Sequence, residues 1–161
     1  DELLTAMNKQ HSSVTTVSQD VSFTGVYSGH SALITKKDAL EYVTNEAIES
    51  AEVTLLDGAK TSVYKKDALT ARDQYDFFLH GPQAIVSIDN DNASSDDELI
   101  IFRDSFGSSI APYFIDQYNR ITLIDIRYIS SSVLDEFVEF SDQDVLFIYN
   151  GTILNSSSMF K

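Results

Sequence analysis

The architecture follows from residues 99–149, which read LIIFRDSFGSSIAPYFIDQYNRITLIDIRYISSSVLDEFVEFSDQDVLFIY. Three runs in this stretch are almost wholly apolar and have the length of short strands: 99–102, 121–124 and 145–149. Between them, apolar residues at helical spacing predict helices over about 110–118 and 132–140. Apolar strands that alternate with amphipathic helices are typical of a parallel sheet covered on both faces. We therefore expect an α/β fold of three layers with a mostly parallel sheet.

The first half of the chain predicts elaborations of this sheet. Alternating apolar residues from Asp20 onward indicate a strand, and helical spacing predicts helices over about 36–45 and 65–79. An Asp57-Gly58 turn signal between two strand-like runs predicts a small β-hairpin around residues 52–64. A short apolar strand is expected over 84–88. We expect residues 1–19 to form a flexible arm and residues 20–161 to form a single α/β domain.

Composition and charge narrow the classes of partner. The chain has 161 residues, about the size of one domain. It has 11 Lys and Arg against 25 Asp and Glu, a formal net charge of −14, which repels phosphate backbones and makes nucleic acid an unlikely partner. No apolar run approaches the roughly 18 residues of a membrane span. The absence of cysteine excludes disulfides and thiolate metal sites and leaves the compartment open.

Polar residues follow each of the three apolar strands. Arg103-Asp104-Ser105 follows the first, Asp125-Ile126-Arg127 the second and Asn150-Gly151 the third. The carboxyl ends of parallel strands meet at one edge of a sheet, where ligands usually bind. A serine between a strand and a helix exposes its hydroxyl beside backbone N–H groups that can hold an oxyanion, so Ser105 is a candidate nucleophile.

Structural interpretations of the same residues remain open. Ser105, Ser108 or Ser109 can cap the helix, which is the commonest role of serine at such a place. Asn150 can be a turn residue. Asp104 and Asp125 can pair with a neighbouring arginine or with a helix N-terminus.

Two sequence blocks carry a resemblance to a known family. They are Phe102-Arg103-Asp104-Ser105-Phe106-Gly107 and Ile124-Asp125-Ile126-Arg127-Tyr128, with 144–150 after them and 23–29 and 73–81 before them. Together they resemble the C-terminal half of the bacterial DHHW family, which is similar to SGNH-hydrolase-like enzymes of the alginate O-acetyltransferase group. The resemblance extends from about residue 20 to residue 155. It implies a sheet like that of SGNH hydrolases and flavodoxin.

The resemblance also implies an activity and its residues. Ser105 would attack an ester carbonyl, Asn150 and the Gly107 backbone would hold the oxyanion, and Asp104 would support the serine. The substrates would be O-acetyl groups of cell-envelope or extracellular glycans, with a glycan or an acyl donor as partner. The implied location is the exterior or surface of a bacterium. Phe106 and Tyr128 fall in loops at the same edge and are candidates to line a pocket.

The general base is the part that this sequence lacks. A serine hydroxyl needs a base within hydrogen-bond reach, usually a histidine. The chain contains no Asp-His-His-Trp string, and its histidines are His11, His30 and His80. His80, four residues after Asp76, is the candidate within the chain, and a structural histidine is the alternative. We expect the base to lie upstream of residue 1. A second possible function is therefore a non-catalytic module that binds a glycan or a protein at the same edge.

No cofactor or metal is predicted. The acidic loop 89–98 departs from the EF-hand pattern, because Ser94 stands where the turn glycine is needed and Ile100 where the last glutamate is needed. We interpret this loop as a solvated charge run. The sequence has neither a histidine pair at metal-binding spacing nor a glycine-rich phosphate loop.

Overall fold

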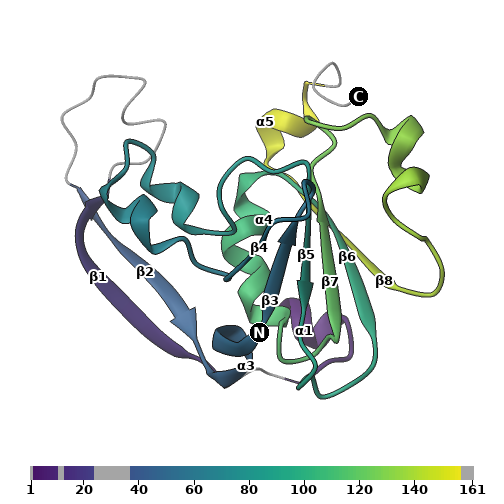
Figure 1. The fold of residues 1–161 in the computed structure, drawn as a ribbon, viewed down its shortest axis with the longest axis horizontal. Helices are drawn as coiled ribbons and strands as arrows, with labels where there is room; N and C mark the ends of the chain where they lie inside the picture. Colours follow the sequence, from purple (N-terminus) through teal and green to yellow (C-terminus); the bar gives the residue numbers. More distant parts are fainter. Residues whose placement is uncertain (1, 11–12, 24–36, 157–161) are drawn as a thin grey trace.

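A computed structural model describes residues 2–10, 13–23 and 37–156 (Figure 1). Its elements in chain order are α1 (Glu2–Ala6), β1 (Thr15–Phe23), β2 (Asp38–Thr44), α3 (Glu46–Ser50), β3 (Glu52–Leu55), β4 (Lys60–Thr61), the 3₁₀ helices η1 (Lys66–Thr70) and η2 (Gln74–Phe77), β5 (Ile85–Asp89), β6 (Glu98–Arg103), α4 (Ser105–Ile110), η3 (Ala111–Phe114), β7 (Arg120–Ile124), η4 (Ser131–Glu136), β8 (Asp144–Ile148) and α5 (Gly151–Leu154).

The main sheet has six strands in the order β4-β3-β5-β7-β6-β8. The predicted parallel set is confirmed, since β6 pairs in parallel with β7 and with β8. The prediction of a mostly parallel sheet is wrong, because β4, β3, β5 and β7 pair antiparallel. The apolar pattern of a strand does not give its direction. Direction follows from the connections, and the short loop 90–97 turns the chain back after β5 without a crossover helix.

The two faces of this sheet are covered unequally. One face carries the larger core, where Val86, Ile101 and Leu123 pack with Phe114 and Tyr118 of the segment after α4. On the other face, a smaller cluster joins Ile100 and Ile124 to Leu134 and Val138 around η4. Figure 1 shows α4 on one side of the sheet and the η4 segment on the other. The fold is thus α/β with a mixed sheet and few helices.

Strand β8 departs from the expectation that the strands are covered on both sides. It lies at the edge of the sheet, and the side chains of Val145 and Phe147 are 49% and 67% exposed. Phe147 stacks on Phe102 of the neighbouring strand, with 4.9 Å between ring centroids. Its apolar sequence therefore did not distinguish an edge strand from a central one.

The helix predicted over 36–45 is wrong, because this segment contains β2, which pairs antiparallel with β1. Leu40 and Val43 are both buried, and their spacing of three suggested one helix face. Both residues belong to the larger core cluster, and two buried residues three apart therefore do not by themselves identify a helix. Tyr42 packs edge-on against Tyr64 and Phe77 and fixes this ribbon to the body of the protein. The part of the strand expected beyond residue 23 lies outside the described residues.

Other predicted elements are found in modified form. The β-hairpin is confirmed: β3 and β4 pair antiparallel around Asp57-Gly58, and Gly58 adopts a φ of 82° that favours glycine. The helix expected over 65–79 is replaced by η1 and η2. The predicted arm contains α1, with Leu4 buried, and the start of β1; its flexibility stays a prediction. Among the described residues, no helix has the length and apolar character needed to cross a bilayer.

Candidate functional site

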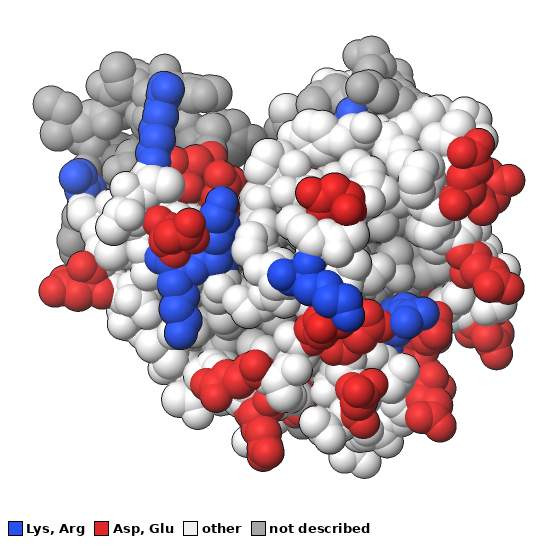
Figure 2. Space-filling model, in the orientation of Figure 1, with Lys and Arg blue, Asp and Glu red and all other residues white. Residues whose placement is uncertain are grey.

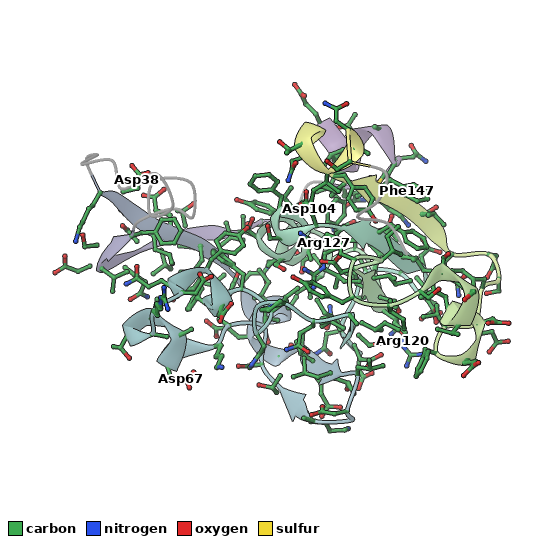
Figure 3. The ribbon with its side chains drawn as sticks, turned by 90° about the horizontal axis from the view of Figure 1, so that it is seen from above. Asp38, Asp67, Asp104, Arg120, Arg127 and Phe147 are labelled. Carbon is green, nitrogen blue, oxygen red and sulfur yellow. The ribbon has the colours of Figure 1, made fainter. Side chains whose placement is uncertain are left out.

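The polar segments after β6, β7 and β8 come together at one edge of the sheet. The Asp104 N–H donates to the Ile148 carbonyl at 3.1 Å and so joins the ends of β6 and β8. Figure 3 looks onto this edge from above and shows Asp104 beside Arg127. The convergence predicted from the three apolar strands is therefore present.

Asp104 is the residue that links two of these segments. Its side chain is fully buried, and its Oδ1 accepts from the Phe106 N–H at 2.9 Å as the N-cap of α4. Its Oδ2 accepts from the Asn150 N–H at 2.7 Å. Because one carboxylate holds both segments, the backbone positions of Ser105 and Asn150 are fixed relative to each other.

Ser105 is the first residue of α4, and its side chain is exposed. The helix cap is Asp104, so the alternative in which Ser105 is the cap is wrong. Neither the hydroxyl nor the N–H of Ser105 forms a hydrogen bond within residues 2–10, 13–23 and 37–156. An exposed hydroxyl next to an available N–H is one part of what a serine nucleophile requires, and a general base is the other.

Asn150 has a structural role as well as an available donor. Its Oδ1 accepts from the Ile153 N–H at 3.0 Å and caps α5. Its Nδ2 has no hydrogen-bond acceptor in the described part of the chain. The amide group can therefore cap the helix with its oxygen and donate to an oxyanion with its nitrogen.

Gly107 is explained by packing. A Cβ atom at this position would lie 2.4 Å from the Cβ of Arg103, so only glycine fits without a shift of the buried arginine. Its N–H donates to the Asp104 carbonyl at 3.1 Å. This N–H already has an acceptor, and its role in an oxyanion hole, which the resemblance implies, stays a prediction.

A buried ionic cluster lies below the serine. Asp125 is fully buried and accepts from Arg127 Nε at 2.8 Å and from Arg127 Nη2 at 2.5 Å. Nη1 of Arg103, which is also buried, lies 3.7 Å from Asp125 Oδ2, and its Nη2 donates to the Gln83 carbonyl at 3.2 Å. Burial lowers the pKa of Arg103, whereas the hydrogen bonds that Arg127 donates to Asp125 raise the pKa of Arg127. The predicted pairing of Asp125 with an arginine is thus confirmed, and the cluster fixes the ends of β6 and β7.

Two tyrosines complete the surroundings and were not predicted. The hydroxyl of Tyr75 donates to the Ser105 carbonyl at 3.0 Å and lies 2.9 Å from Ser109 Oγ. Burial raises the pKa of Tyr75, so the hydroxyl stays protonated and available as a donor. Burial, with Asp125 nearby, raises the pKa of Tyr149 to about 12. Tyr75 lies 30 residues before Ser105 in η2, within the segment predicted as a helix, where the sequence indicated only a core position for it.

His80 is held by the β-hairpin. Its Nε2 lies 2.9 Å from Thr61 Oγ1 and 3.0 Å from the Ser62 carbonyl, and no hydrogen bond joins it to Ser105 among the described residues. Its φ of 63° is in the left-handed region. The structure therefore brings Asp104, Ser105, Gly107 and Asn150 together and binds the His80 ring to another element.

Replacing His80 with asparagine is expected to leave the reactivity of Ser105 unchanged within about twofold. Asparagine tolerates a positive φ, so the backbone is preserved. Loss of the contacts to Thr61 and Ser62 should lower the free energy of unfolding by about 1 kcal/mol. The checks are urea denaturation and the acylation rate of Ser105. A fall in that rate of about tenfold or more would identify His80 as the base within the chain.

Within the described ranges, no three histidine, aspartate or glutamate side chains lie close enough together to hold a metal ion.

Phe106 and Tyr128 are 46% and 51% exposed, and the Arg127 guanidinium lies 5.3 Å from the centre of the Tyr128 ring. The edge thus offers aromatic surface beside the serine.

These features define an α/β module that presents a serine at a strand-to-helix turn. The sequence matches no family model and no curated protein. Solved structures with the same fold include a DHHW family protein from Eubacterium siraeum, with a TM-score of 0.69 and 22% identity over 99% of this chain. Bacillus cereus PatB1 with a sulfonyl adduct has a TM-score of 0.59 and 16% identity over 99% of this chain. A second PatB1 structure has a TM-score of 0.54 and 19% identity over 92%. The chain spans about half of each, between 50% and 55%.

Proposed function

We propose that this chain is the serine-bearing part of an SGNH-like module, related to DHHW family proteins, that transfers or removes acyl groups. The observation that carries the proposal is the Asp104 carboxylate, which binds the Asn150 N–H and caps the helix that begins at Ser105. This arrangement places an exposed hydroxyl and two available donors, the Ser105 N–H and Asn150 Nδ2, on one rigid frame.

In the proposed reaction, Ser105 Oγ forms a bond to the carbonyl carbon of an ester while its proton passes to a base. The carbonyl oxygen gains negative charge and accepts from the Ser105 N–H and Asn150 Nδ2. The C–O bond to the leaving alcohol then breaks, the alcohol takes up the proton, and an acyl-serine remains. Water or a glycan hydroxyl releases the acyl group in the second half of the reaction. We propose a histidine outside these 161 residues as the base.

The proposed substrates are O-acetyl groups of cell-envelope or extracellular glycans, and the proposed location is the bacterial surface. The exposed rings of Phe106 and Tyr128 support a glycan as the substrate, because aromatic faces pack well against sugar rings. We also propose that the three-layer SGNH arrangement, with a helical layer on the second face of the sheet, is completed by further chain. The coverage of 55% of the DHHW family structure supports that view.

The second candidate function is glycan binding without catalysis. It is favoured by the position of the His80 ring, which is hydrogen-bonded to the β-hairpin and not to Ser105. Binding needs only the aromatic edge, whereas acyl transfer needs the hydroxyl.

The test is acylation of the chain by 4-nitrophenyl acetate, followed by mass spectrometry of the peptides. The expected result is slow addition of one acetyl group to Ser105, because solvent must take up the hydroxyl proton in place of the base. No steady-state turnover is expected, because release of the acyl group by water also needs the base. Ser105→Ala should remove the label. Asn150→Ala should slow labelling by about tenfold or more through loss of an oxyanion donor. Asn45→Ala, which removes the cap of α3 in the same way, is the matched control and should not slow it. Equal acetylation of unrelated serines would contradict acyl transfer and leave glycan binding.

A further inference from the structure

A cavity lies at the opposite end of β6 from Ser105. It is a cleft of about 940 Å³, within the usual size range of small-molecule sites. Glu98, at the start of β6, lines it, whereas Arg103 at the end of β6 belongs to the serine edge. The two residues are five positions apart along the strand, about 16 Å. The cleft is therefore a separate feature that the proposed acyl transfer does not use.

The floor of the cleft is a row of hydroxyl side chains on the sheet. Thr54, Ser87 and Thr122 lie side by side on β3, β5 and β7 and all line the cleft. Thr122 is only 8% exposed, and its hydroxyl has no hydrogen-bond partner among the described residues. The hydroxyl is not among the fully buried side-chain atoms without a partner in the described residues, so it is open to the cleft, where a polar ligand atom or a water can bind it.

The rim of the cleft has more carboxylates than basic side chains to pair with them. Lys9 pairs with Asp97, and Arg120 pairs with Asp89. Asp96, Glu139 and Asp142 also line the cleft, and none has a basic partner in the described part of the chain. Figure 2 shows acidic side chains along the right-hand side of the molecule, where residues 131–148 run in Figure 1. The site thus favours a ligand that carries positive charge.

The spacing of these groups distinguishes a metal ion from an organic cation. No three carboxylates in the described ranges are close enough to share one ion. Asp96 lies in the loop between β5 and β6, Glu139 and Asp142 lie in the segment between η4 and β8, and the apolar side chains of Ile100 and Val138 also line the cleft. A ligand that fits has several ammonium groups joined by short methylene chains.

We propose that this cleft binds a small linear oligoamine. Its ammonium groups pair with Glu139, Asp142 and Asp96, its methylene chains contact Ile100 and Val138, and one N–H donates to the Thr122 hydroxyl. Ammonium groups and carboxylates form charge-assisted hydrogen bonds. The hydroxyl at the floor fixes the position of the oligoamine along the cleft.

The test is isothermal titration calorimetry of the 161-residue chain with spermidine at about 20 mM salt, where surface charges are weakly screened. We expect one site that the double variant Glu139→Gln/Asp142→Asn weakens about tenfold. Thr122→Val keeps the shape of the side chain and should weaken binding about threefold. The control is Asp20→Asn/Glu41→Gln, which removes two charges from the exposed β1–β2 ribbon and should change the affinity less than twofold.

Three results would overturn the proposal. The first is absence of saturable binding up to about 5 mM spermidine, because a dissociation constant above that concentration is too weak for a specific site. Equal weakening by the control variant would show that the total charge of −14 attracts the amine without a site. Binding of a trilysine peptide but not of spermidine would show that the occupant is a polypeptide. Since none of these readouts involves Ser105, they are independent of acyl transfer.

Discussion

Replacement of Asp125 with alanine is expected to lower the free energy of unfolding by about 3–5 kcal/mol. Asp125 is the carboxylate that neutralises the buried Arg103 and binds Arg127 through two hydrogen bonds. Without it, two guanidinium groups remain close together, and that of Arg103 cannot reach water. Urea denaturation, followed by circular dichroism, measures the loss.

A matched control shows whether burial is the reason. Asp89 pairs with Arg120 at 2.6 Å, but both side chains are partly exposed, at 33% and 51%. Asp89→Ala should therefore cost less than about 1 kcal/mol, as is usual for surface ion pairs. Similar losses for Asp125→Ala and Asp89→Ala would contradict a buried cluster at the ends of β6 and β7.

The second large effect is expected at Asp104. Asp104→Ala should lower the free energy of unfolding by about 2–4 kcal/mol, because the N–H groups of Phe106 and Asn150 both lose a charged acceptor. The variant should also slow acylation of Ser105, since α4 and α5 are no longer tied together.

The control for Asp104 is another aspartate cap. Asp73 caps η2 and accepts only from the Tyr75 N–H, at 3.0 Å, so Asp73→Ala should cost about 1 kcal/mol. If Asp104→Ala costs no more than Asp73→Ala, the link to Asn150 does not contribute, and the frame that holds Ser105 and Asn150 is wrong.

The residues of the candidate site could be predicted where strands are marked by continuous apolar sequence. The runs that became β6, β7 and β8 are parallel, and elementary geometry then brings Asp104, Asp125 and Asn150 to one edge. The Asp57-Gly58 turn was predicted equally well, because its chemistry is local.

The remaining features depend on long-range packing. The direction of β5 follows from a short loop, and β2 is a strand because it pairs antiparallel with β1. Tyr75 reaches Ser105 from 30 residues away, and Arg103 is buried although arginine is usually exposed. None of these contacts leaves a periodic signal in the sequence.

The most direct measurement of the central claim compares two serines in one molecule. Ser105 and Ser131 are both exposed first residues of short helices, and each follows a capping side chain. Only Ser105 lies where the parallel strands converge. After treatment with phenylmethanesulfonyl fluoride, peptide mass spectrometry gives the extent of labelling at each. Labelling of Ser105 about tenfold or more above that of Ser131 is the predicted result. Equal labelling, or none at Ser105, would contradict an activated serine at this edge of the sheet.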